Sequence, residues 1–190
     1  MSDTRSNQSK ALVHRDQAGR DINNVANYYV SEPSQLAGWF QKLDQQISED
    51  RRDARNHFVD TLKFFIDKRD QVDVVGLAEK IKKSGFNIPH RSALEKKEAF
   101  VKLLLKYQEF SSAQELFGYF LSHIYEVFDE KICPFIQGMS YEDIQKIVDK
   151  EIIDRLFAEI GGGSSQMLLN KTHVRGMIYW LADKCFVRWH

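Results

Sequence analysis

The side chains that most often bind metal ions are too widely spaced in this sequence to form a compact site. All six histidines lie more than four residues from any other histidine or cysteine. Neither CxxC nor HExxH occurs, which disfavours a zinc site of the usual local spacing. Asp53, His57 and Asp60 could share one helix face, but a solvated histidine beside surface carboxylates is the simpler interpretation. We therefore expect no metal site.

The candidate nucleophiles lack the neighbours that would activate them. Cys133 precedes Pro134, and Cys185 lies between Lys184 and Phe186. Neither thiol has a base partner that the sequence identifies, so buried structural thiols are favoured. No Gly-x-Ser-x-Gly motif occurs. We expect no catalytic residue and a chain that is not an enzyme.

Two short motifs resemble catalytic or phosphate-binding sequences but have structural explanations. The glycine-rich run 161–165 lacks the Gly-Lys-Ser/Thr ending of a phosphate-binding loop and follows a predicted helix, so we expect a flexible connection between helices. Glu95 and Lys97 form the acid-x-Lys pair of some metal-dependent nucleases, but Glu95 is explained by a helix cap. We expect no cofactor, and a metal-dependent nuclease is kept as an alternative function.

Basic residues gather around a loop at Gly85–Pro89. The loop joins two predicted helices, but the second soon becomes apolar, which disfavours a DNA-recognition helix. A nucleic-acid-binding adaptor is a further alternative, in which removing these charges would flatten the salt dependence of binding. The candidate phosphate contacts are Lys82, Lys83, Arg91, Lys96 and Lys97.

The composition limits the class of protein. The 190 residues carry 27 Lys and Arg against 27 Asp and Glu, and this zero net charge disfavours a strongly basic nucleic-acid binder. Hydrophobic residues make up 43%, enough for a folded core, and two cysteines are too few for a disulfide scaffold. With no run of 18 apolar residues and a polar start, we expect a cytoplasmic protein without a membrane segment.

Apolar residues recur at steps of three and four along most of the chain. This pattern predicts a mainly α-helical domain of five to seven helices. The first helical stretch runs from Pro33 to Ile66, as one helix or as two with a break near 48–52. Later signals are a glycine stop at Gly85, capping boxes at Ser92–Glu95 and Ser112–Glu115, a helix start at Ser140, a stop at Gly161 and a last helix over 172–183.

Both ends of the chain differ from its helical middle in their pattern of apolar and polar residues. Residues 1–10 are predicted to be a disordered tail, and 11–30 read as a β-hairpin ribbon around Gly19. Residues 31–190 form the predicted helical domain, which ends in a short strand because Cys185–Trp189 alternates in polarity.

Two segments carry a resemblance to a known family. Gln17–Asn23 resembles the Gln-x-Gly-x-Asp-Ile ribbon at the start of C-terminal domains in bacterial ABC-three-component conflict systems, a group that includes Lamassu-like antiphage defence. Val174–Trp189 resembles the ending of such domains, a helix followed by a short strand.

The resemblance implies a non-catalytic docking or assembly domain. The resemblance implies that in these systems the effector docks on an SMC-like ABC ATPase with a small middle component. On this resemblance we expect the domain to stand alone, without the catalytic head of the effector. We expect protein partners of a defence complex or a homo-oligomer, with one member of each adjacent aromatic pair exposed. The predicted partner-binding residues are Gly19, Arg20, Asp21, Ile22, Tyr28, Tyr29, Gly176, Tyr179, Trp180 and Trp189.

Overall fold

The computed structural model describes residues 35–55, 57–67 and 76–189. The predicted tail 1–10 and the predicted hairpin 11–30 lie outside these residues. The described helices belong to one compact unit, residues 33–190.

Helices account for most of the described part, as the apolar spacing predicts. The α-helices are α2 (Gln35–Ser48), α3 (Asp60–Ile66), α4 (Leu77–Ser84), α5 (His90–Tyr107), α6 (Ser111–Val127), α7 (Tyr141–Ile147), α8 (Arg155–Ile160) and α9 (Lys171–Asp183). Two π-helical stretches, η1 (Phe128–Ile132) and η3 (Val148–Asp154), and a 3-10 stretch, η2 (Cys133–Gly138), continue them. Since α6–η1–η2 and α7–η3–α8 are each continuous, the described residues form seven helical runs.

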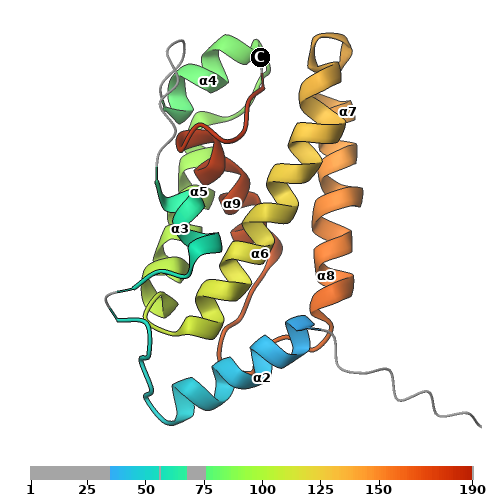
Figure 1. The fold of residues 1–190 in the computed structure, drawn as a ribbon. Coiled ribbons are helices and arrows are strands. Elements are labelled where there is room, and N and C mark those ends of the chain that lie inside the picture. The colour runs from blue at the N-terminus through green and yellow to red at the C-terminus, as the bar shows by residue number, and fades with distance from the viewer. Residues whose placement is uncertain (1–34, 56, 68–75, 190) are drawn as a thin grey trace, which may run out of the picture. The chain divides into compact units, whose positions relative to one another are not determined.

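Helix α6 lies at the centre of the core. It packs against α2, α3 and α9, and Figure 1 shows it running between α3 and the α7–α8 run. Its leucines and phenylalanines are fully buried because apolar residues cover most of its circumference. This burial confirms that the segment is part of the core.

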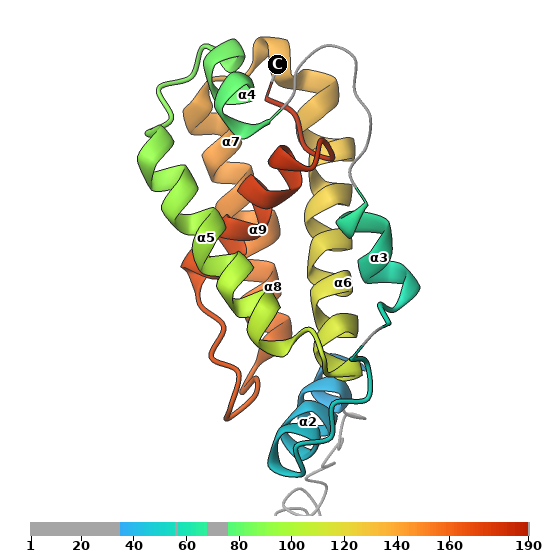
Figure 2. The same cartoon turned by 90° about the vertical axis from the view of Figure 1, so that its left-hand side faces the viewer.

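Helices α5 and α9 pack together unusually closely. Figure 2 shows them side by side, and Gly176 lies at the contact. A Cβ atom at Gly176 would lie 2.1 Å from the carbonyl oxygen of Lys96, so only glycine fits there. One turn away, Phe100 and Trp180 meet edge to face at 5.6 Å. The close approach therefore serves packing within this chain.

A helical hairpin projects at one end of the domain. The α6–η1 run ascends, η2 turns the chain at the tip, and the α7–η3–α8 run descends beside it (Figure 1). Lys131 in η1 forms a 2.5 Å ion pair with Glu151 in η3, and the His123 ring nitrogen bonds to the backbone oxygen of Glu151 at 2.8 Å. The ion pair ties the two π-helical stretches to each other, and the His123 contact ties α6 to η3.

The observed helix boundaries agree with the predicted ones where the residues that start or stop the helix lie next to its end in the sequence. Gly85 ends α4 in the left-handed conformation, α8 stops before Gly161, and Ser140 opens α7 with a capping box to Asp143. The helix predicted over 172–183 begins at Lys171. The first helical stretch divides in two, with a gap between Ser48 and Asp60 wider than expected.

The capping boxes predicted at Ser92 and Ser112 are wrong. Pro89 occupies the cap position of α5, so Ser92 lies inside the helix and Glu95 instead pairs with Arg91 at 3.0 Å. At the start of α6, Asp53 takes the capping role, because its carboxylate accepts hydrogen bonds from the backbone and side chain of Ser111 at 2.8 Å. Both starts depend on residues outside the predicted motifs.

The predicted C-terminal strand is also wrong. Among the described residues no strand occurs, and Cys185–Trp189 wraps over the end of α9 instead. Cys185 takes a left-handed conformation with φ of 70°, and the backbone N–H groups of Cys185 and Phe186 bond to the oxygens of Ala182 and Leu181. This is a Schellman turn, and the apolar residues Phe186, Val187 and Trp189 after it are buried without forming a strand.

Candidate partner-binding site

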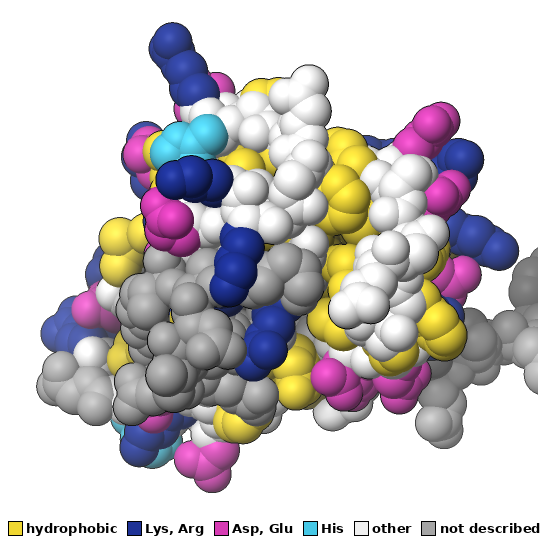
Figure 3. All heavy atoms as spheres, turned by 90° about the horizontal axis from the view of Figure 1, so that it is seen from above, with side chains coloured by type: hydrophobic (Ala, Val, Ile, Leu, Met, Phe, Trp, Pro, Cys, Tyr) yellow, Lys and Arg dark blue, Asp and Glu magenta, His cyan; other side chains and the backbone are white. Residues whose placement is uncertain are grey.

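The tip of the helical hairpin exposes apolar side chains. Phe135 in η2 has 61% of its surface exposed, Pro134 is exposed, and Ile136 and Met139 are half-buried. Pro134 suits the first turn of η2, where its missing N–H costs no helical hydrogen bond. We name Pro134, Phe135, Ile136 and Met139 the apolar tip. Seen from this end, hydrophobic side chains are exposed between charged ones (Figure 3).

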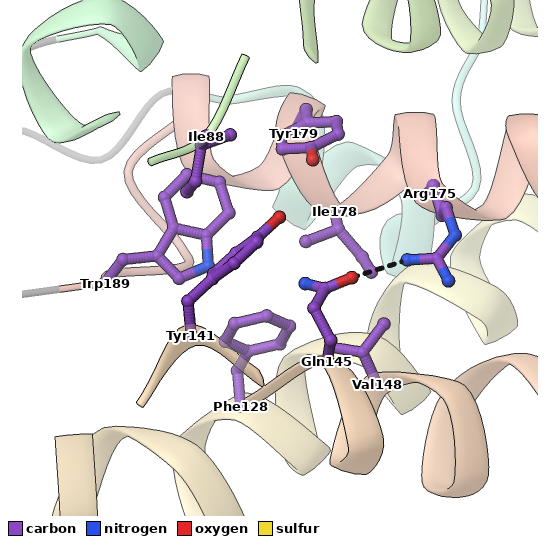
Figure 4. Close-up of a pocket in the computed structure, with 9 residues that line it drawn as sticks. All are labelled: Ile88, Phe128, Tyr141, Gln145, Val148, Arg175, Ile178, Tyr179 and Trp189. Carbon is purple, nitrogen blue, oxygen red and sulfur yellow. Dashed lines mark hydrogen bonds between the residues drawn. The ribbon is translucent and has the colours of Figure 1, made fainter. Parts of the chain in front are cut away.

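An aromatic cluster supports the base of the apolar tip. Figure 4 shows Tyr141 of α7 reaching toward Tyr179 of α9, with Trp189 beside it. The rings of Tyr179 and Trp189 are 5.7 Å apart, as are those of Phe86 and Tyr141. The cavity among these side chains holds only about 10 Å³, room for one water at most. The cluster therefore braces the tip and leaves no space for a small-molecule substrate.

Polar contacts close the other side of the cluster. Arg175 of α9 donates a 2.9 Å hydrogen bond to Gln145 of α7 and forms an ion pair with Asp149 of η3 (Figure 4). Burial, together with the hydrogen bond to Tyr141, raises the pKa of Tyr179 far above its ordinary value. The hydrogen bond between Tyr179 and Tyr141 joins α9 to α7.

Charge is distributed unevenly over the neutral chain. Between residues 129 and 155, which include the hairpin tip, there are seven Asp and Glu against four Lys and Arg. Across α4 and α5, residues 77–107, there are eight Lys and Arg against three Glu. Glu130 and Glu142 are exposed and flank the apolar tip in the sequence, and we call these two residues its acidic border.

Four of the predicted partner-binding residues lie in the part of the chain that the structure describes. Gly19, Arg20, Asp21, Ile22, Tyr28 and Tyr29 lie outside the described residues. Trp180 and Trp189 are 6% and 3% exposed, and Gly176 is buried against α5. Tyr179 is half-buried in the aromatic cluster. Partner binding by these residues stays a prediction, and within the described part their contacts are internal.

The predicted phosphate contacts differ in exposure and in their ion-pair partners. Lys82 and Lys83 are exposed in the last turn of α4, whereas Lys97 pairs with Asp183 at 3.1 Å and Arg91 with Glu95. Lys96 is half-buried beside the α5–α9 contact. Two of the five cations are thus paired with carboxylates, and nucleic-acid binding stays an alternative prediction.

The model of C-terminal domain 9 (CTD9) of the ABC-three component (ABC-3C) systems matches residues 76–189, from the residue before α4 to the segment that follows α9. The chain belongs to this family. The resemblance seen in Val174–Trp189 is thereby confirmed, while Gln17–Asn23 precedes the matched residues. Searches of curated proteins and of solved structures found no match.

In this CTD9 domain the glycine-rich run 161–165 is held by contacts from α2. The Asp44 carboxylate accepts hydrogen bonds from the hydroxyls of Ser164 and Ser165 and from the backbone N–H of Ser165 at 3.1 Å. An apolar hollow of about 140 Å³ lies beside the glycines, lined by Phe40, Phe157 and neighbouring side chains. The loop predicted to be flexible is therefore tied to α2.

The side chains that could bind a metal ion or act as nucleophiles mostly have structural roles. Among the described residues, no three His, Cys, Asp or Glu side chains converge to hold a metal ion, and no helix is long and apolar enough to cross a bilayer. Burial raises the pKa of the Cys133 thiol. Cys185 is buried, as expected of a structural thiol.

Sequence reasoning missed the apolar tip of the CTD9 domain. The signal was available, because Pro134 and Gly138 bracket the apolar pair Phe135–Ile136, and apolar residues in a turn have no helix face on which to be buried. The prediction of partner-binding residues favoured the adjacent aromatic pairs instead.

Proposed function

We propose that this chain is a non-catalytic docking domain that joins a bacterial antiphage ABC-3C complex by binding another protein of that system. Membership of the CTD9 family supports an assembly role, and the exposed apolar tip is the observation that carries the proposal.

The tip has the chemistry of a protein-binding anchor. An exposed phenylalanine bordered by half-buried apolar residues offers a large contact area, and a solvated rim surrounds it. The acidic border selects for a partner surface with an apolar socket flanked by lysine or arginine. The SMC-like ATPase and the middle component implied by the family are the first candidates.

The hairpin is suited to present this anchor in a fixed orientation. The aromatic cluster and the Arg175–Asp149 ion pair connect α7 and η3 to α9, and α6 is buried in the core. Few side chains and backbone segments of the hairpin then become ordered when the partner binds, and this limits the conformational entropy lost on association.

The test is binding between the full chain and the purified proteins encoded by its neighbouring genes. Phe135→Asp places a charge at the centre of the anchor, so we expect affinity to fall by roughly thirty-fold or more, a hot-spot loss of about 2 kcal/mol. Isothermal titration calorimetry or biolayer interferometry measures the affinity.

Leu105→Asp is the matched control. Leu105 is 58% exposed on α5, so it introduces the same charge at a comparably exposed apolar position away from the tip. Unchanged affinity in this variant is expected. Equal losses in both variants, or none in Phe135→Asp, would contradict docking through the tip.

A further inference from the structure

A lysine is completely buried at the end of α9. Lys80 of α4 has 0% of its surface exposed, although lysine is almost never fully buried without a partner. Its Nζ donates hydrogen bonds to the backbone oxygens of Ala182 at 2.7 Å and Val187 at 3.4 Å. Lys80 therefore sits inside the Schellman turn that follows α9.

A thiol shares this enclosed space. Cys185 is the left-handed residue of the same turn, is 1% exposed, and is hydrogen-bonded to the amino group of Lys80. The backbone oxygens on both sides of it, those of Ala182 and Val187, contact the same nitrogen. The turn thus places a nucleophilic sulfur and a nitrogen next to each other, out of bulk water.

The surroundings of the amine oppose its positive charge. Burial lowers the pKa of Lys80, and the charge of Arg188 acts in the same direction, while Cys185 and Asp183 oppose it. Asp183 is itself engaged by Lys97 and by the backbone N–H of Leu77 at 3.1 Å each. A neutral amine has the lone pair that nucleophilic attack requires.

We propose that Lys80 and Cys185 form a reversible oxidative cross-link, a sulfenamide, when the folded chain meets hydrogen peroxide. One peroxide molecule oxidises the thiol to a sulfenic acid and is reduced to water. The amine of Lys80 then attacks the sulfur, so that an S–N bond forms as the S–O bond breaks. The departing hydroxide takes one proton from nitrogen and leaves as a second water.

The cross-link would join α4 to the segment after α9. These are the two ends of the matched CTD9 region, so the bond would close nearly all of it into one covalent loop. Closing a long loop restricts the unfolded chain, and we therefore expect the oxidised form to unfold at a higher temperature. A dithiol reductant reverses the bond by attacking the sulfur and releasing the amine.

The experiment uses the full chain carrying Cys133→Ser, which leaves one thiol. The folded protein is treated with hydrogen peroxide, its remaining thiol is alkylated after unfolding, and tryptic peptides are analysed by mass spectrometry. We expect a peptide containing Lys80 to be joined to Cys185–Arg188, lighter than their sum by two hydrogen atoms. Dithiothreitol should separate the two peptides.

Several outcomes would overturn the proposal. These are an unmodified Cys185, a sulfenic or sulfinic acid with Lys80 unlinked, a bond to Lys184 or Lys97, or a linked product of any other mass. Lys80→Arg replaces the amine with a guanidinium that is not nucleophilic, so this variant should be oxidised at Cys185 without a cross-link. The mass of the Cys133→Ser product decides the question even if Lys80→Arg does not fold.

Discussion

At the scale of single residues, Gly176 shows how one missing side chain sets the distance between two helices. Its hydrogen lies where any other residue would place a carbon against the Lys96 carbonyl, and this backbone oxygen cannot rotate away. From the sequence, Gly176 was predicted to be a partner-binding residue. The approach occurs within the domain, between α5 and α9.

Gly176→Ala should therefore destabilise the fold. A Cβ atom 2.1 Å from a carbonyl oxygen forces α5 and α9 apart, and we expect the free energy of unfolding to fall by about 3 kcal/mol, as for severe overpacking. Urea denaturation followed by circular dichroism measures the change.

Gly38→Ala is the control, since a Cβ atom at Gly38 in α2 would meet nothing within 4 Å. It should leave stability unchanged or raise it by up to about 1 kcal/mol; equal effects at both glycines would refute the packing argument.

The role of a single residue can be predicted from the sequence when the residues that it contacts are close to it in the sequence. Gly85, Ser140 and Gly161 were placed correctly because a helix end is decided within a few residues. Periodicity alone could not separate the buried Trp180 from the exposed Phe135, since both are aromatic residues among apolar neighbours. Which of them is exposed is determined by helices far away in the chain.

At the scale of elements, the start of α6 is organised from a distance. Asp53, located between α2 and α3, accepts from Ser111, and Gln46 of α2 donates to Asp53 at 2.6 Å. Ser112, the predicted cap, is buried, and its hydroxyl has no hydrogen-bond partner among the described residues. The local motif was wrong because side chains more than fifty residues away occupy the helix end first.

Two substitutions separate the local cap from the distant one. Asp53→Ala should lower the free energy of unfolding by about 1–2 kcal/mol, the usual cost of a lost cap. Ser112→Ala should cost little, because its hydroxyl makes no cap hydrogen bond. Thermal or urea denaturation of the two variants checks the order. A larger loss in Ser112→Ala would restore the capping box that the sequence predicted.

The contact between Asp44 and the 161–165 run should make stability depend on pH. Burial by itself would raise the pKa of Asp44, but hydrogen bonds from Ser164, Ser165 and Gln166 outweigh it and hold the pKa below its usual 3.8. A carboxyl group whose pKa is lowered by folding stabilises the fold above pH 3.8, and that contribution is lost as the pH falls through the folded-state pKa.

Asp44→Asn is the corresponding variant. At neutral pH we expect it to be less stable than the original chain by about 1 kcal/mol, because hydrogen bonds to a charged acceptor are replaced by bonds to a neutral one. The difference should shrink as the pH falls below 3.8. Urea titrations across that range measure it, and a gap that stays constant with pH would rule out the carboxylate as its source.

At the scale of the whole described domain, a zero net charge conceals two regions of opposite sign. The hairpin region 129–155 is acidic and the α4–α5 region is basic. The composition correctly disfavoured a uniformly basic protein, but a sum over the chain cannot report where charges lie. The helical class was predictable because periodicity depends only on sequence order. The separation of charge can be read from the same sequence once each region is counted by itself.

Docking through the tip should therefore be sensitive to salt. Glu130→Gln with Glu142→Gln removes two exposed acidic side chains near the apolar tip, so partner affinity should fall less steeply with rising salt than in the original chain. Affinities measured from low to high sodium chloride give the slope. Glu98→Gln on α5 is the control and should keep the original slope; if it changes the slope as much, the acidic border does not face the partner.

The paired π-helical stretches imply a rule for chain-length variation among homologues. Each π turn accommodates a residue that regular α-geometry would not, and Lys131 and Glu151 link the two stretches across the hairpin. Deleting one residue from a single arm would shift its register against the other and rotate the tip. Insertions and deletions in η1 and η3 should therefore have been inherited together, as compensated pairs.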